Sequence, residues 1–266
     1  MNIHDKDVLE RFLNFSTQSP SHANILQEFS TLNNSSVCIL SDDNKGFAYV
    51  PGKRNDRVLL VASLEFGLDY TNQEIPTFKN GYYITSGQKS FLDIAVASSA
   101  ILYLLKDSGH SLLVINDKDT WDLFVPDVIT TIREQHKDLF EEFNSHQYVL
   151  EFNYRNYRSL DFVLPVTHDF RNFIEDNTSF FEEHDDEMCP PLMRSNIHAL
   201  CERICGANIS AGYHKNRKKG AFLNLAEWKH TLNVFRNFLK EPQPRFPLSY
   251  YVSHSNDSGL PNFREQ

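Results

Sequence analysis

The chain lacks any hydrophobic run long enough to cross a membrane. Of its 266 residues 41% are apolar, but no stretch approaches the roughly 18 consecutive apolar residues that a membrane helix needs. The N-terminal stretch MNIHDKDVLERFLNF is polar and repeats with helical spacing, unlike the apolar centre of a secretion signal. We therefore expect a soluble, cytoplasmic protein with no membrane partner.

Cysteine is scarce, and its spacing does not match a structural zinc motif. The chain has four cysteines, Cys38, Cys189, Cys201 and Cys205, and no two of them form a C-x-x-C pair. We expect reduced thiols, as is usual in a reducing compartment. Cys201 and Cys205 are four residues apart within a predicted helix, so they are expected to share one of its faces.

Several motifs that carry chemistry are also missing. The sequence contains no G-x-G-x-x-G, no P-loop and no G-x-S-x-G, so neither nucleotide chemistry nor a serine hydrolase is indicated. The formal net charge of -9 argues against broad nucleic-acid binding. Phenylalanine is abundant instead, with 21 residues, and predicts an aromatic-rich core.

Hydrophobic periodicity predicts helices that alternate with strands. Two helices at the N-terminus are followed by a β-hairpin whose turn is at 42–46, and residues 71–87 are expected to form an irregular loop. Further strands are expected at 57–63, 111–116, 147–155 and 207–213, and further helices at 92–109, 127–144, 167–176, 191–204 and 226–241. This alternation indicates an α/β sandwich.

The residues after Glu241 differ from the rest of the chain. Pro242, Pro244 and Pro247 leave no helical pattern, and a polar stretch follows them. We expect one domain at 1–240 and a C-terminal tail at 241–266 that is either a docked arm or disordered.

Four stretches, taken in order, resemble the zinc-dependent aminopeptidase and carboxypeptidase superfamily. RVLLVASLEFG is similar to the strand that ends in His-x-Asp, and LDIAVASSAIL to the helix start Asp-Asp-Arg-Ala-Gly. LLVINDKDTW resembles the strand that ends in Asp-Glu-Glu, and NISAGYHKNRKKGAFLNL the late strand with its His-bearing loop. The resemblance implies a three-layer α/β/α sandwich with a mixed central sheet and no inserted second domain.

Such enzymes hold two zinc ions with imidazoles and carboxylates and use a Glu as general base. The resemblance places Ser63 at the position of the first His ligand, and Glu65 at the nearby acid that orients rather than binds. The bridging Asp falls on Leu92, or on Asp93 if the alignment is shifted by one residue.

The remaining positions of the implied site are changed as well. Lys118 is at the position of the general-base Glu, and Asp119 is at the position of the Glu ligand that follows it. The late Asp falls on Asn153, and the last His on Arg217, although His214 is three residues earlier on what is expected to be the same loop.

These substitutions predict a metal-free site. Lys118 and Arg217 place positive charge where a metal ion would be held, and two fixed cations repel a dication in a partly desolvated cleft. We expect both cations to pair with Glu65, Asp93 or Asp119 and so to replace the lost metal charge. No cofactor and no catalytic residue are then expected.

The most direct function of such a chain is binding. We expect a peptide, amino-acid or protein ligand in the former cleft, held by the set of Lys118, His214, Lys215 and Arg217. The first alternative is a residual metal-dependent aminopeptidase or hydrolase that binds zinc through Asp93, Asp119 and His214, or through the acidic segment 180–189. The second alternative is a structural subunit, such as a homo-oligomer.

Overall fold

The structure is a computed structural model. It describes residues 3–15, 21–32, 34–39, 45–65, 77–84, 94–117, 127–155, 157–162, 166–182, 196–216 and 220–248.

The described strands form a single mixed sheet. They are β1 (Ser36–Ile39), β2 (Gly46–Val50), β3 (Leu59–Glu65), β4 (Thr77–Lys79), β5 (Tyr82–Ile84), β6 (Ser111–Asp117), β7 (Val149–Arg155), β8 (Ser159–Asp161), β9 (Phe181–Glu182), β10 (Gly206–Asn216) and β11 (Gly220–Asn224). Their order is β1-β2-β6-β3-β7-β10-β11-β5-β4, with β8 and β9 branching from β10. The centre, β6-β3-β7-β10, is parallel, and the flanking pairs are antiparallel.

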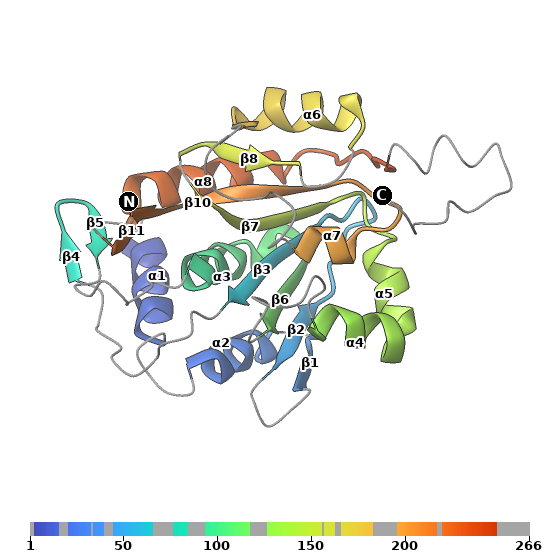
Figure 1. The fold of residues 1–266 in the computed structure, drawn as a ribbon, viewed down its shortest axis with the longest axis horizontal. Coiled ribbons are helices and arrows are strands. Elements are labelled where there is room, and N and C mark those ends of the chain that lie inside the picture. The colour runs from blue at the N-terminus through green and yellow to red at the C-terminus, as the bar shows by residue number, and fades with distance from the viewer. Residues whose placement is uncertain are drawn as a thin grey trace, which may run out of the picture.

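Helices cover both faces of this sheet (Figure 1). They are α1 (Ile3–Phe15), α2 (Ser21–Ser30), α3 (Ile94–Leu104), α4 (Asp127–Gln135), α5 (Lys137–Phe143), α6 (His168–Thr178), α7 (Asn196–Leu200) and α8 (Leu225–Phe238). α1, α2, α3 and α8 lie on one face, while α4, α5 and α7 lie on the other. The architecture is therefore the α/β/α sandwich with a mixed sheet that the sequence predicts, and no second domain is evident in the described residues.

The central strands are continuous apolar runs because helices bury them from both sides. Every described side chain of β3 from Leu59 to Leu64 is buried. Successive side chains of a strand point to opposite faces of the sheet, so neighbouring residues pack against different helix layers. Phe152 of β7 contacts Phe235 of α8 with ring centroids 5.1 Å apart, whereas its neighbour Glu151 faces α7. The aromatic-rich core that the composition predicts is confirmed around these strands.

Local signals explain several element boundaries. Thr167 begins α6 by accepting a hydrogen bond from the Phe170 amide, as a helix N-cap does. Asn224 caps α8 in the same way and accepts from the amides of Ala226 and Glu227. Gly109 follows α3 and a short 3-10 turn with φ 80°, the left-handed conformation in which glycine commonly ends a helix.

The hairpin at 77–84 corrects the sequence interpretation. These residues were expected to be irregular, yet β4 and β5 pair antiparallel around Asn80 and Gly81. Both turn residues have positive φ, 51° and 87°, which is the conformation of a type I′ turn. An Asn-Gly pair between aromatic residues is a strong hairpin signal, and the loose polar flanks had obscured it.

The helix expected at 191–204 is shorter than predicted. α7 covers Asn196–Leu200, residues 191–195 lie outside the described residues, and Cys201 is not helical. The helix ends because the side chain of Asn144 captures the amides of Glu202 and Arg203, at 2.9 and 3.2 Å, and turns the chain toward β10. The expectation that Cys201 and Cys205 share one helix face is therefore wrong. Both are buried free thiols.

The first part of the C-terminal tail is packed against the domain. We call residues 242–248 the strap. The Phe246 carbonyl accepts from the Cys205 amide at 2.8 Å, and the Phe246 amide donates to Gln147 at 3.1 Å. The Phe246 ring contacts Tyr148, Phe170 and Phe173. Residues 249–266 lie outside the described part of the chain.

Candidate functional site at the carboxyl ends of the central strands

The topology singles out the carboxyl ends of β3 and β7. After β3 the chain passes through α3 on one face and returns as β6. After β7 it passes through β8, α6, β9 and then α7, which lies on the other face, and reaches β10 on the side of β7 away from β3. In open parallel sheets, ligands bind where adjacent strands send their connections in opposite directions. This switch point is therefore the candidate site.

Three polar side chains from three elements meet there. Ser63 on β3, Glu151 on β7 and Asn196 at the start of α7 are only 3%, 0% and 5% exposed. The Ser63 hydroxyl donates to Glu151 Oε1, and the Asn196 amide donates to Ser63 Oγ and, at 2.9 Å, to Glu151 Oε1. We call Ser63, Glu151 and Asn196 the edge cluster.

Sheet register explains why Glu151 belongs to this cluster. β3 and β7 pair as far as Val61 and Glu151. Ser63 is two residues beyond Val61, so it lies on the same face one step nearer the carboxyl end. A glutamate is long enough to reach it diagonally from the neighbouring strand. Sequence reasoning missed Glu151, although a carboxylate in an otherwise apolar strand was the available signal.

Asn153, the residue expected at the late ligand position, lies at an irregularity of the sheet. The pairing between β7 and β10 shifts between Asn208 and Ser210, so β7 has one extra residue there. The Asn153 amide donates to the Asn208 side chain at 3.0 Å. Such bulges redirect side chains near functional sites.

Cys201 lies close to the edge cluster. It is 3% exposed, and its amide donates to the carbonyl of Ile197 at 2.9 Å. Burial raises the pKa of the Cys201 thiol well above its ordinary value, and the neighbouring Cys205 and Glu151 raise it further. This thiol is therefore neutral and unreactive in the folded protein.

The edge cluster does not fit a zinc ion. Zinc takes imidazole, thiolate or carboxylate ligands, and the Ser63 hydroxyl is a poor substitute for an imidazole. The Asn196 amide directs N–H groups, which carry partial positive charge, toward the only carboxylate of the cluster. Within the described ranges, His, Cys, Asp and Glu side chains nowhere gather in threes as a metal site.

Most of the other expected site residues cannot be placed relative to this cluster. Glu65 ends β3, and its register partner is Asp117 at the end of β6. The backbone of Lys215 belongs to β10. Outside the described residues lie Leu92, Asp93, Lys118, Asp119 and Arg217, so the pairing expected of Lys118 and Arg217 stays a prediction.

His214 is on a strand rather than on the expected loop. It lies near the end of β10, because the strand continues to Asn216 and pairs with β11. Its ring stacks on Phe222 with centroids 4.9 Å apart, and its Nε2 contacts Glu227 of α8. Asn224 donates to the other oxygen of Glu227 at 2.6 Å. The described contacts thus tie His214 to the start of α8 and not to the edge cluster.

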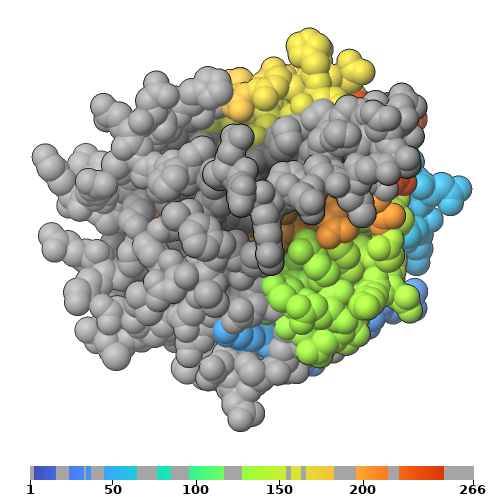
Figure 2. All heavy atoms as spheres, turned by 45° about the vertical axis from the view of Figure 1, so that its right-hand side comes forward, coloured from blue at the N-terminus to red at the C-terminus, as the bar shows by residue number. Residues whose placement is uncertain are grey.

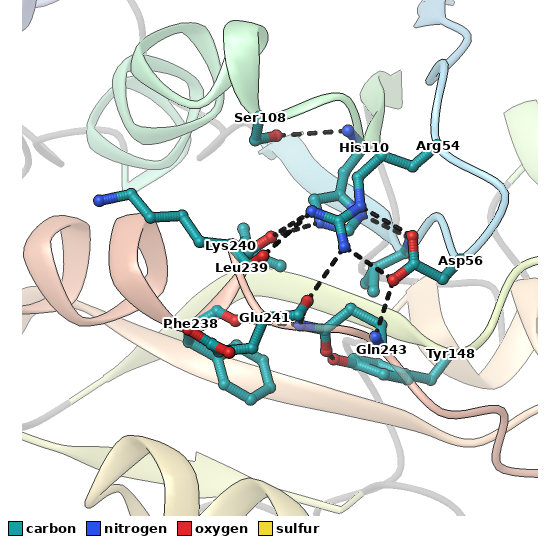
Figure 3. Close-up of polar contacts among 11 residues, drawn as sticks. Arg54, Asp56, Ser108, His110, Tyr148, Phe238, Leu239, Lys240, Glu241 and Gln243 are labelled. Atoms are coloured by element: carbon teal, nitrogen blue, oxygen red, sulfur yellow. Dashed lines mark hydrogen bonds and ion pairs between the residues drawn. The ribbon is translucent and has the colours of Figure 1, made fainter.

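A second polar network lies at the amino ends of the same strands (Figure 3). Arg54 forms a double hydrogen bond with Asp56, at 2.8 and 2.7 Å. Its other N–H groups reach the carbonyls of Leu239 and Glu241, just after α8, at 3.1 Å each. The Arg54 hydrogen bonds hold the pKa of Asp56 well below its usual range. A cation that caps a helix C-terminus is stabilising, so this network is structural.

Two buried histidines sit at this amino edge. His146 accepts from the Ser111 hydroxyl at 2.7 Å and donates from Nδ1 to the carbonyls of Glu142 and Phe143. Burial lowers its pKa to about 4. Burial also lowers the pKa of His110. Both rings are therefore neutral near neutral pH.

The chain matches no protein-family model and no curated protein by sequence. Among solved structures it is similar to a tripeptidase from Staphylococcus aureus, with TM-score 0.54, 8% identity and 89% of this chain and 98% of that chain covered. It is also similar to an aminopeptidase from the archaeon Desulfurococcus kamchatkensis, with TM-score 0.53 and 8% identity. That match covers 98% of this chain and 99% of the aminopeptidase.

A glutaminyl cyclase from an Acidobacteriales bacterium is also similar, with TM-score 0.51, 8% identity and 90% and 93% coverage. At these identities the likeness concerns the fold alone. No described helix has the length and apolar character needed to span a membrane. The chain thus has the aminopeptidase-like α/β/α fold that its resemblance implies.

Proposed function

We propose that this chain is a catalytically inactive, peptidase-like protein that acts by binding a ligand or partner at the carboxyl edge of its sheet without a metal ion. The observation that carries the proposal is the edge cluster. The hydroxyl of Ser63, near the carboxyl end of β3, and the amide of Asn196, at the start of α7, are both directed at Glu151.

Electrostatics supports this reading. A buried carboxylate is stable only when hydrogen bonds or a cation compensate its charge. Ser63 and Asn196 supply that compensation with neutral groups, so Glu151 has no need of a metal ion. We propose a peptide, an amino acid or a protein segment as the ligand, since this edge of the fold is where ligands of α/β sheets bind.

Metal analysis of the purified full chain tests the proposal. We expect substoichiometric zinc after dialysis, no heat of zinc binding by calorimetry, and no hydrolysis of amino-acid amides when zinc, manganese or cobalt is added. The same measurements are made on Ser63→Ala, which removes the hydroxyl of the edge cluster and leaves every other candidate ligand in place. About two zinc ions per chain together with amide hydrolysis would overturn the proposal.

One observation favours a residual hydrolase as the second candidate. Glu65 and Asp117 are register partners at the carboxyl ends of β3 and β6, and β3 also pairs with β7, which carries Glu151. Carboxylates on adjacent strands suit a metal that prefers oxygen ligands. This candidate predicts metal-dependent hydrolysis that Asp117→Asn abolishes and that Ser63→Ala leaves in place.

A further inference from the structure

Helix α7 is held at its two ends by different sets of contacts. Its C-terminal end is fixed by several hydrogen bonds from the α4–α5 layer. Arg133 donates to the carbonyl of Ala199 at 2.7 Å, and Asn144 donates to that of Leu200 at 3.0 Å. The surfaces of α4–α5 (green) and of the segment that begins with α7 (orange) lie side by side in Figure 2, and α4 contacts α7 directly.

The N-terminal end is held by Asn196 and by Ile197, which is 0% exposed and packs on Gly206 of β10. Asn196 supplies polar contacts with the central strands, through its bonds to Ser63 of β3 and Glu151 of β7. They are fully desolvated, and Glu151 is 0% exposed. Losing a hydrogen bond to a buried charge is costly, so these contacts strongly favour the closed position.

We infer that the edge cluster is a conformational latch: when the contacts of Asn196 with Ser63 and Glu151 break, the N-terminal end of α7 swings away from the sheet about the end fixed by Arg133 and Asn144. The closed latch covers Glu151 of β7, and the open latch exposes it. The latch does not rest on the proposed binding function, because it follows from the contacts of α7 alone.

Cys201 reports on the opening of the latch. α7 packs closely on the start of β10, where a Cβ placed on Gly206 would be 2.5 Å from Ile197 and 3.0 Å from the Cys201 sulfur. Ile197 and the Cys201 sulfur thus lie against the same position of Gly206. Lifting the N-terminal end, which carries Ile197, therefore uncovers the Cys201 thiol, although Cys201 itself follows the fixed end. Cys205 is an internal reference, because its thiol donates to the carbonyl of Pro247 in the strap, at 3.3 Å. A local opening of α7 therefore makes the Cys201 thiol accessible to a reagent and leaves the Cys205 thiol protected.

The test is alkylation of the folded full chain with N-ethylmaleimide, followed by mass spectrometry that reads Cys201 and Cys205 separately. In Asn196→Ala we expect Cys201 to react about tenfold faster or more, while the rate of Cys205 stays unchanged. Ser63→Ala keeps the bond from Asn196 to Glu151, so the rate of Cys201 rises less. This milder variant also serves if Asn196→Ala does not fold.

Thr231→Val is the matched control for a general loss of stability. It removes a buried hydrogen bond to Ser210, 2.9 Å long, on the α8 side of the sheet and away from α7. We expect it to leave the ratio of the Cys201 and Cys205 rates unchanged. Equal acceleration of both thiols in folded Asn196→Ala, or no acceleration of Cys201 in either cluster variant, refutes the latch.

Discussion

Nε2 of His110 lies 2.9 Å from the carbonyl oxygen of Leu239, so a residue just before the central strand β6 holds the end of helix α8. Its other ring nitrogen, Nδ1, accepts from the Val58 amide at 3.0 Å. One ring nitrogen must donate and the other accept, so the ring is the neutral tautomer with the proton on Nε2. Protonation of Nδ1 would break the bond to Val58.

Acid should therefore unfold the protein through its buried histidines. The pKa of His146 is lowered from 6.5 to about 4 by burial, and that of His110 is lowered too. The unfolded chain therefore binds protons at a higher pH than the folded chain. The free energy of unfolding decreases as the pH drops below about 6.5, and the contribution of neutral His146 to it is fully lost near pH 4. For His146 the shift corresponds to roughly 3 kcal/mol. Urea unfolding at several pH values in this range measures how the free energy of unfolding depends on pH. The same dependence in His146→Gln as in the unchanged protein would show that His146 is not its source.

Replacing Arg54 by Lys should destabilise the protein although the charge is kept. A lysine cannot reproduce the planar fork that binds Asp56 and the carbonyls after α8 at the same time. We expect a loss of roughly 1–3 kcal/mol in the free energy of unfolding. Arg203→Lys is the control, since its ion pair with Glu141 is largely exposed and should contribute less than about 1 kcal/mol. Similar losses in the two variants would show that the fork is unimportant.

Gly212→Ala should be among the more damaging single changes. Gly212 has φ 76°, and a Cβ there would be 2.5 Å from the Trp228 amide nitrogen at the start of α8. Gly81 has φ 87° with nothing within 4 Å of its Cβ position, so Gly81→Ala tests the backbone effect alone. We expect about 1–2 kcal/mol for Gly81→Ala and roughly 3 kcal/mol or more for Gly212→Ala, by thermal unfolding. Equal losses would mean that α8 does not need this close approach.

Phe246→Ala should weaken the attachment of the strap. The ring is half-buried and contacts Tyr148, Phe170 and Phe173, at 6.0, 5.2 and 5.1 Å between centroids. We expect a loss of roughly 2–4 kcal/mol in the free energy of unfolding. Glu241→Ala changes an exposed side chain next to the strap and should stay within about 0.5 kcal/mol. A loss below 1 kcal/mol for Phe246→Ala, on the order of a surface change, would show that the strap is not part of the core.

Periodicity predicted most of the fold because central strands and amphipathic helices carry their own patterns. The hairpin at β1 and β2, strands β3, β6 and β7, and helix α8 follow directly from apolar spacing and turn residues. Strands β8 and β9 were missed because they are only three and two residues long. Elements of that length depend on their partners and show no repeat of their own.

The candidate site was only partly predictable. Ser63 followed from the resemblance of its strand to one that ends in His-x-Asp, and the structure puts it in the edge cluster. Asn196 could not be foreseen, because it lies 133 residues away in sequence and its contact is purely tertiary. Glu151 required the register of β3 and β7, which depends on pairing rather than on local pattern.

The strap has a consequence for how the chain folds. It lies across the amino ends of β7 and β10, where Phe246 pairs with Gln147 and Cys205. Helix α8, just before it, holds α1 through Arg236 and Asp5, 231 residues apart. During synthesis the earlier strands emerge long before these partners do, so the amino edge stays open until residue 248 has been made. Contacts this distant in sequence slow folding, and we expect the half-made chain to depend on chaperones that shield exposed apolar strands.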